Sequence, residues 1–69
     1  MTNAIVKNNQ VINVVAGSAE TCDMIAKQVY GEDAYAVPTG KYPVEIGDRY
    51  LDEIFYRYVN YEWIPLEET

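Results

Sequence analysis

The sequence predicts a small α+β domain, in which one α-helix packs on one face of a small antiparallel or mixed β-sheet that contains two hairpins. Two runs rich in β-branched residues flank a polar stretch near the N-terminus, one later segment has a helical apolar period, and short strand-like pieces alternate with turn residues after it. We therefore expect a single domain over residues 1–69, with a hairpin at about 4–16, a helix at about 18–30, a strand at about 34–37 and a C-terminal hairpin or meander at about 44–64.

The first hairpin is predicted around the polar stretch from Lys7 to Gln10. Ala4 to Val6 precede this stretch, and the longer run from Val11 to Val15 follows it. Asparagine tolerates a positive φ better than most residues, so Asn8 and Asn9 can form a tight turn between two antiparallel strands. Because the second run carries apolar side chains on both faces, we expect it to be a central strand.

The helix has both a start signal and a stop signal. The hydroxyl of Ser18 can cap its first turn, and Gly31 can adopt the left-handed conformation that ends a helix. Asp23 and Lys27 form an i,i+4 pair of opposite charge, which we expect on the side away from the sheet. The apolar stripe that should lie on the sheet consists of Cys22, Ile25, Ala26, Val29 and Tyr30.

The second half of the chain alternates short strands with turns. The strand near 34–37 follows a strand and a helix, an order that permits a right-handed parallel crossover and would set this strand beside one arm of the first hairpin. Pro38 and Pro43 are expected at strand ends or on an edge, because proline cannot donate to a ladder. A second hairpin is predicted with arms at Arg49 to Leu51 and Ile54 to Tyr58 around Asp52-Glu53, followed by a strand from Tyr61 to Ile64.

The composition favours a protein partner over nucleic acid, membrane or metal. Eleven Asp plus Glu against five Lys plus Arg give a formal net charge of -6, which disfavours binding to phosphate backbones. No apolar run approaches a membrane span and no signal peptide is recognisable, so we expect a cytosolic protein or one assembled into a particle from the cytosol. Cys22 is the only cysteine and there is no histidine, which excludes an internal disulfide and the usual zinc ligand sets. A protein partner or homo-oligomer is the remaining common stabiliser of so small a domain.

No group of residues has the pattern of a catalytic site. Cys22 falls on the predicted buried stripe without a histidine to activate it, so it is interpreted as a core residue. Asp48, Asp52 and Glu53 could in principle supply an acid and a base, but acidic residues in turns far more often serve as solvated turn formers. Glu32-Asp33 lacks the third acid of a calcium loop. We therefore expect no enzyme activity, no cofactor and no metal site.

The segment from Glu45 to Trp63 is the candidate binding surface. It holds four of the seven tyrosines, the only phenylalanine and the only tryptophan. A single helix can cover only one face of a sheet, so aromatic rings on the other face would form an exposed patch that favours a protein partner. The candidate partner-binding residues are Tyr50, Tyr56, Tyr58, Tyr61 and Trp63.

Strand parity divides the side chains of this segment between two faces. If Ile54 to Val59 is one strand, Tyr56 and Tyr58 share a face with Ile54, and the other face carries Phe55, Arg57 and Val59. Phe55 and Val59 are the more apolar anchors, whereas Arg57 beside them favours solvent. Which face the helix covers is left open, with a preference for Tyr56 and Tyr58 on the partner side.

The order of motifs resembles a known phage module. "KNNQVINVVAG", then a stretch ending in "AYAVP", then "VEIGDRYLDEIFYR" is similar to a small module at the C-terminal end of many bacteriophage tail and tail-fibre proteins, which also occurs as short free-standing phage proteins. The similarity covers most of residues 4–57. Two turn glycines of the family are replaced by Asn9 and Glu53, so the second turn is expected to be longer or of a different type.

The resemblance implies a phage origin and a structural or attachment role, without catalytic residues to transfer. Together with the composition, it predicts a non-enzymatic phage structural or protein-interaction module, tail-associated, that binds through an aromatic sheet face and is located in the host cytoplasm or the virion. The alternative is a small acidic phage inhibitor of a host defence protein, either anti-CRISPR-like or a nucleic-acid mimic, because eleven acids on so short a chain could imitate phosphates.

Overall fold

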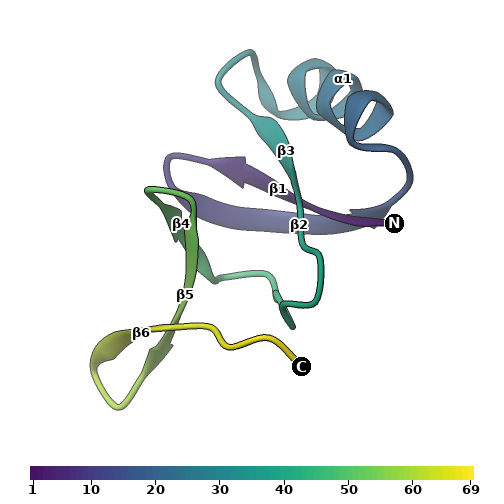
Figure 1. Ribbon diagram of the computed structural model, residues 1–69. Helices are drawn as coiled ribbons and strands as arrows, with labels where there is room; N and C mark the ends of the chain where they lie inside the picture. The colour runs from purple at the N-terminus through teal and green to yellow at the C-terminus, as the bar shows by residue number, and fades with distance from the viewer.

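One helix and one six-stranded sheet make up the fold (Figure 1). The computed structural model describes all residues 1–69, and the strand order in its sheet is β3-β1-β2-β4-β5-β6. This arrangement confirms the predicted α+β class, with both hairpins joined in one sheet. The elements are β1 (Thr2–Lys7), β2 (Gln10–Ala16), α1 (Ala19–Tyr30), β3 (Tyr35–Pro38), β4 (Arg49–Leu51), β5 (Ile54–Val59) and β6 (Glu62–Pro65).

The sheet consists of two parts joined by a short seam. The helix-bearing half comprises β1, β2, β3 and α1, and the C-terminal meander comprises β4, β5 and β6 (Figure 1). The ladder between β2 and β4 contains only the pair Gln10 and Arg49. Three backbone hydrogen bonds hold the seam, from Val11 N–H to Asp48 O at 2.8 Å, from Tyr50 N–H to Asn9 O at 2.8 Å and from Gly47 N–H to Val11 O at 2.9 Å. Because the seam is short, most of β2 has no strand on its outer side.

The position of β3 agrees with the predicted parallel crossover, in which α1 connects β2 to a strand that runs in the same direction. β3 lies beside an arm of the first hairpin, where it pairs antiparallel with β1, from Val6 opposite Tyr35 to Asn3 opposite Pro38. It therefore runs parallel to β2 with β1 between them. The reason is that β1 already occupies the inner side of β2, so the chain returning from α1 passes over β1 to the next free edge.

The helix side of the sheet forms one small core. Ala26 and Ala34 are fully buried, and their small side chains allow the helix to approach the sheet closely. Only part of the predicted stripe enters this core, because Ile25 and Val29 remain 51% and 63% exposed. The buried members of the cluster are Ile5, Cys22, Ala26 and Ala34.

A second core lies on the opposite side of the same strands. Alternation along β1 and β2 sends Ala4, Val6 and Val11 to the face away from the helix, where Phe55 from β5 packs on them. The sheet is thus apolar on both faces, as expected for β2. The meander, and not the helix, covers this second face.

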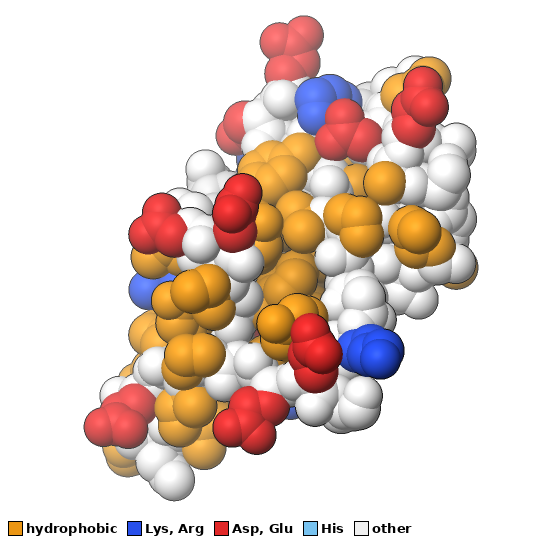
Figure 2. All heavy atoms as spheres, viewed as in Figure 1, with side chains coloured by type: hydrophobic (Ala, Val, Ile, Leu, Met, Phe, Trp, Pro, Cys, Tyr) orange, Lys and Arg blue, Asp and Glu red, His pale blue; other side chains and the backbone are white.

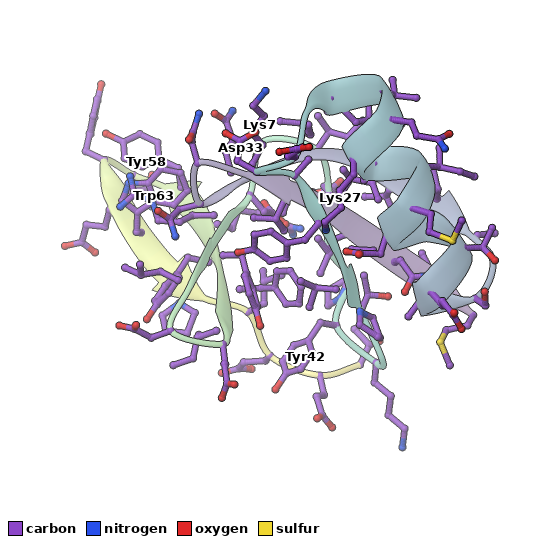
Figure 3. All side chains as sticks on the ribbon, turned by 90° about the horizontal axis from the view of Figure 1, so that it is seen from above. Lys7, Lys27, Asp33, Tyr42, Tyr58 and Trp63 are labelled. Carbon is purple, nitrogen blue, oxygen red and sulfur yellow. The ribbon has the colours of Figure 1, made fainter.

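Capping residues fix both ends of α1. The Oγ atom of Ser18 accepts a hydrogen bond from Thr21 N–H at 3.2 Å, as predicted for the first turn. Gly31 follows the helix at φ 112°, where a Cβ would lie 3.1 Å from Asp33 Oδ1. Lys7 donates to the last helical carbonyl, that of Tyr30, and pairs with Asp33 at 3.6 Å (Figure 3). The helix end is therefore tied to β1.

The Asp23 and Lys27 pair clips the outer edge of β3. Asp23 Oδ1 accepts from Ala36 N–H at 3.0 Å, Lys27 Nζ donates to Ala34 O at 3.1 Å, and the two side chains pair at 2.9 Å. This corrects the expected position of the pair, which faces the sheet edge and not the solvent side of the helix. Two backbone groups that an edge strand would leave open are thereby satisfied.

Three two-residue turns connect β1 to β2, β4 to β5 and β5 to β6. All six turn residues have positive φ, which is the pattern of a type I′ turn. The second turn is therefore as short as the others and has the same φ pattern, in contrast to the longer turn or different turn type expected from its missing glycine. Asparagine suits such positions, whereas Glu53 at φ 66° and Tyr61 at φ 66° are strained.

Replacing Glu53 by glycine should raise the free energy of unfolding by about 1 kcal/mol, because glycine removes the Cβ strain at positive φ. Chemical denaturation of the wild type and Glu53→Gly measures the change. Glu53→Ala is the matched control, since alanine removes the carboxylate but keeps the strain. An equal gain in both variants would assign the effect to charge and not to backbone conformation.

The Asp23 and Lys27 clip should also make the free energy of unfolding depend on pH in the acid range. The hydrogen bond from Lys27, followed by that from Ala36 N–H, lowers the pKa of Asp23 below its ordinary value of 3.8. Its stabilisation is therefore fully present above the ordinary value and is lost as the pH falls through the lowered pKa. We expect Asp23→Asn to be less stable than wild type at neutral pH, with the difference shrinking under strong acid. A constant difference at every pH would contradict this.

Candidate functional site

The outer face of the C-terminal meander gathers the largest exposed aromatic side chains. The registers Arg49 to Tyr56 and Tyr58 to Trp63 place alternate residues of β4, β5 and β6 on the face that points away from the core. Figure 2 shows the near side of the meander at its lower left, where hydrophobic and acidic side chains alternate on the surface. We call this surface the outer aromatic face, and its residues are Arg49, Leu51, Ile54, Tyr56, Tyr58, Trp63 and Pro65.

Tyr58 and Trp63 form the centre of this face. Their rings are cross-strand neighbours with centroids 5.1 Å apart and an interplanar angle of 57°. The guanidinium carbon of Arg49 lies 4.3 Å from the centroid of the Trp63 ring, a distance at which the cation and the ring attract each other. Tyr58 is 53% exposed and Trp63 is 37% exposed. Figure 3 shows the pair side by side at the end of the molecule away from the helix.

The other candidate aromatic residues are distributed differently. Tyr56 lies on the same face, opposite Arg49 and Pro65, and is partly buried. Tyr61 sits in the turn between β5 and β6 and is 91% exposed. The structure therefore brings Tyr56, Tyr58 and Trp63 onto one surface and places Tyr61 at its rim.

Tyr50 belongs to the opposite side of the meander. Its ring lies 4.7 Å from that of Phe55 and 6.4 Å from that of Tyr35. Burial, and then the charge of Glu53, raises the pKa of the Tyr50 hydroxyl above its ordinary value. Tyr50 thus packs near the second core and does not join the outer aromatic face. The parity predicted for β5 is observed, but its inner face meets β1 and β2 and not the helix.

The charge of Arg57 suggested that its side chain points into solvent, but the structure shows that Asp48 holds it. Its Nε donates to Asp48 Oδ1 at 3.1 Å and its Nη2 to Asp48 Oδ2 at 3.0 Å. The same Nη2 donates to Pro43 O at 2.6 Å and pairs with Glu45 at 3.0 Å. The two hydrogen bonds to Asp48 raise the pKa of Arg57 above its ordinary value. This two-pronged pairing of charged groups holds the inner face of β5 against the loop before β4.

Asp48 is the buried partner in this pair, with only 5% of its side chain exposed. Its Oδ2 also accepts from Glu45 N–H at 2.8 Å, and its own N–H donates to Glu45 O at 3.1 Å. The predicted turn role of Asp48 is therefore seen, but the partnership with Arg57 was missed. The signal in the sequence was an arginine on the apolar face of a strand, which requires a buried acceptor.

A cleft of about 310 Å³ opens between β3, its following loop and the meander. Its apolar walls come from Val37, Tyr42, Tyr50 and Phe55, and Glu53, Lys41 and Glu68 also line it. In Figure 2 the corresponding hollow is lined by hydrophobic side chains in the middle of the molecule. Sequence reasoning did not find this cleft, because it depends on how the meander folds against β3.

The residues considered for chemistry are not assembled into one site. Cys22 is buried at 4% exposure and its Sγ lies 3.5 Å from Asn3 Nδ2 and 3.8 Å from Ala16 O. Asp48 is engaged by Arg57, whereas Asp52 and Glu53 form an exposed turn. No three Asp, Glu or Cys side chains come together in a way that could hold a metal ion.

None of the protein-family models, curated proteins or solved structures compared with the chain matches it. The one helix, α1, has 12 residues and is not long and apolar enough to cross a membrane. The properties of the outer aromatic face are thus the main basis for a functional proposal.

The pairing of Asp48 with Arg57 should make Arg57→Lys lower the free energy of unfolding by about 1–2 kcal/mol, because lysine keeps the charge but cannot form the fork. Arg57→Ala should cost more, about 3 kcal/mol, since it leaves the buried carboxylate of Asp48 without its charged partner. Urea denaturation measures both. Arg49→Lys on the outer aromatic face is the control, and an equal loss there would argue against a special role for Arg57.

Proposed function

We propose that this protein is a non-enzymatic interaction module that binds a protein partner, or another copy of itself, through the outer aromatic face. The observation that carries the proposal is the Tyr58, Trp63 and Arg49 cluster on a sheet face that no element of the chain covers. Tyrosine, tryptophan and arginine are the side chains most enriched where proteins bind each other, because they combine large rigid surfaces with polar groups.

The proposed contact surface has the physical properties of an interface centre. Leu51, Ile54 and Tyr58 are each at least 40% exposed along one side of the meander. Burying apolar side chains of this kind gains roughly 25 cal/mol for each Å² removed from water. The exposed acids Asp52, Glu53 and Glu62 lie in a turn of the meander and at the start of β6, where they would form a polar rim and favour a partner with basic groups.

The proposed biological setting is a phage particle, with the module attached to the tail. Its support is the resemblance of "KNNQVINVVAG" and "VEIGDRYLDEIFYR" to the module found at the ends of phage tail and tail-fibre proteins. The buried Asp48 gives the Gly47-Asp48 part of that motif a structural reason, since it holds the meander in place. Mass spectrometry of purified virions would find several copies of the chain if this setting is correct, and none if the protein acts only inside the host cell.

The double variant Tyr58→Ala with Trp63→Ala should weaken association much more than folding. We expect at least a tenfold loss of affinity for the partner or for self-association, because the variant removes two central rings. The loss of folding stability should be only about 1–2 kcal/mol, since both rings are partly exposed. Analytical ultracentrifugation, with the chain alone and mixed with purified phage tails, measures association, and thermal unfolding measures stability.

Tyr42→Ala is the matched control for this experiment. Tyr42 has the same exposed fraction as Trp63, 37%, but lies in the loop beside Phe55 and away from the outer aromatic face (Figure 3). Association should survive in this variant. Parallel losses of association and stability in the double variant would assign Tyr58 and Trp63 to the core. Binding to a host nuclease that is abolished by reversing surface acids, and unchanged in the double variant, would instead support the acidic-inhibitor alternative.

A further inference from the structure

An apolar groove runs between α1 and β2, on the side of the sheet opposite the meander. Ile25 and Val29 form its helix wall, and Val15 lies on its strand side. Cys22 and Ala26 lie deeper, in the helix-side core. The groove has a volume of about 250 Å³ and no charged side chain lines it. Ile25 and Val29, the exposed residues of the predicted helix stripe, face this groove and not the sheet.

Both terminal edges of the sheet are protected against another strand. On β3, the Asp23 and Lys27 clip occupies Ala36 N–H and Ala34 O, and Pro38 has no N–H to offer. On β6, the bond from Leu66 N–H to Phe55 O means that Pro65 is one of the residues whose backbone points outward. These are common ways in which natural sheets avoid unwanted pairing.

The outer edge of β2 is different. Gly17 N–H donates to Met1 O at 2.8 Å, so the alternation of an antiparallel ladder turns the backbone groups of Ala16 and Val14 away from β1. β4 does not reach these residues, because its only ladder pair with β2 is at Gln10. The side chain of Asn13 accepts from Val14 N–H at 2.9 Å, which is a local substitute for a neighbouring strand. Val14 C=O and Ala16 N–H have no such substitute.

The open edge and the groove lie next to each other. Val15, between the two outward-pointing residues, directs its side chain to the helix face of the sheet, where Ile25 and Val29 are exposed. A strand added to β2 would therefore place alternate side chains beside Ile25 and Val29. Backbone bonding at the edge would supply affinity, and the groove would select the side chains.

We propose that β2 and α1 form a second binding site, which takes an extended segment of a partner protein by strand addition. The segment has aliphatic side chains at alternate positions, because the lining of the groove is uncharged and mostly apolar. Its flanks are basic, because the whole chain carries a net charge of -6. The same charge on two copies of this chain disfavours self-pairing at this edge.

This site is separate from the outer aromatic face and goes beyond the function proposed above. The groove belongs to the helix-bearing half, whereas Tyr58 and Trp63 lie at the far end of the meander (Figure 3). The Tyr58→Ala and Trp63→Ala variant should therefore keep strand binding. Failure of one proposal leaves the other unaffected.

The test uses ¹⁵N-labelled protein and synthetic peptides of the form Lys-Lys-Thr-x-Thr-x-Thr-Lys-Lys, with Val, Ile, Leu or Phe at x. We expect at least one peptide to shift the amide signals of Val14, Ala16 and Val29 in a saturable manner at concentrations up to about 1 mM. Val29→Lys should weaken that binding at least tenfold, because it places a charge in the groove. Ala16→Pro should do the same by removing the outward N–H while leaving the bonds to β1.

Met24→Lys is the matched control, since Met24 is 58% exposed on the same helix but does not line the groove. Its peptide affinity should equal that of the wild type. Val29 is itself 63% exposed, so the Val29→Lys variant should remain folded, and its amide spectrum checks this. The proposal is overturned if no peptide shifts these signals, if the shifts map to Tyr58 and Trp63, or if Val29→Lys binds as well as Met24→Lys. A solution dimer that Ala16→Pro converts to monomer would assign the edge to a second copy and also overturn it.

Discussion

The buried ion pair between Asp48 and Arg57 is the contact on which the arrangement of the two parts of the sheet depends. The backbone of Asp48 joins the seam at Val11, and its carboxylate holds Arg57 in the middle of β5. A buried carboxylate is costly unless it is fully paired, so the loop before β4 and the strand β5 must stay together. Phe55, two residues earlier on β5, is thereby directed onto the face of β1 and β2. The ion pair with Asp48 orients β5, and the outer aromatic face includes the opposite face of that strand.

The two candidate binding surfaces arise because the chain has too few elements to cover its sheet. α1 lies over β1 and β3, so its Ile25 and Val29 side chains and the end of β2 are left uncovered. The meander covers the other face of β1 and β2 with one of its own faces, so its second face, with Tyr58 and Trp63, is open. In a chain of 69 residues such surfaces are a direct result of geometry, because one helix and one short meander can each shield only one side.

Local features of the fold could be predicted from the sequence, whereas the relation between distant segments could not. Ser18 and Gly31 identified the helix ends because capping depends on neighbouring residues. The parity of β5 was also predictable, since side chains alternate in any strand. The partner of Arg57 was missed, and the arm of the first hairpin that β3 pairs with was left open, because both depend on how separate elements pack against each other. For the same reason Tyr50 was grouped with the exposed rings although it packs on Phe55.

The three two-residue turns also bear on the order in which the chain assembles. A tight hairpin closes within microseconds and loses little loop entropy, so β1 with β2, β4 with β5, and β5 with β6 can each find their register independently. β1 and β3 are neighbours in the sheet, but β2 and α1 separate them along the chain. Three of the five strand pairings in this sheet are therefore local in sequence, whereas β1 with β3 and β2 with β4 join distant segments, a kind of contact that slows folding in general.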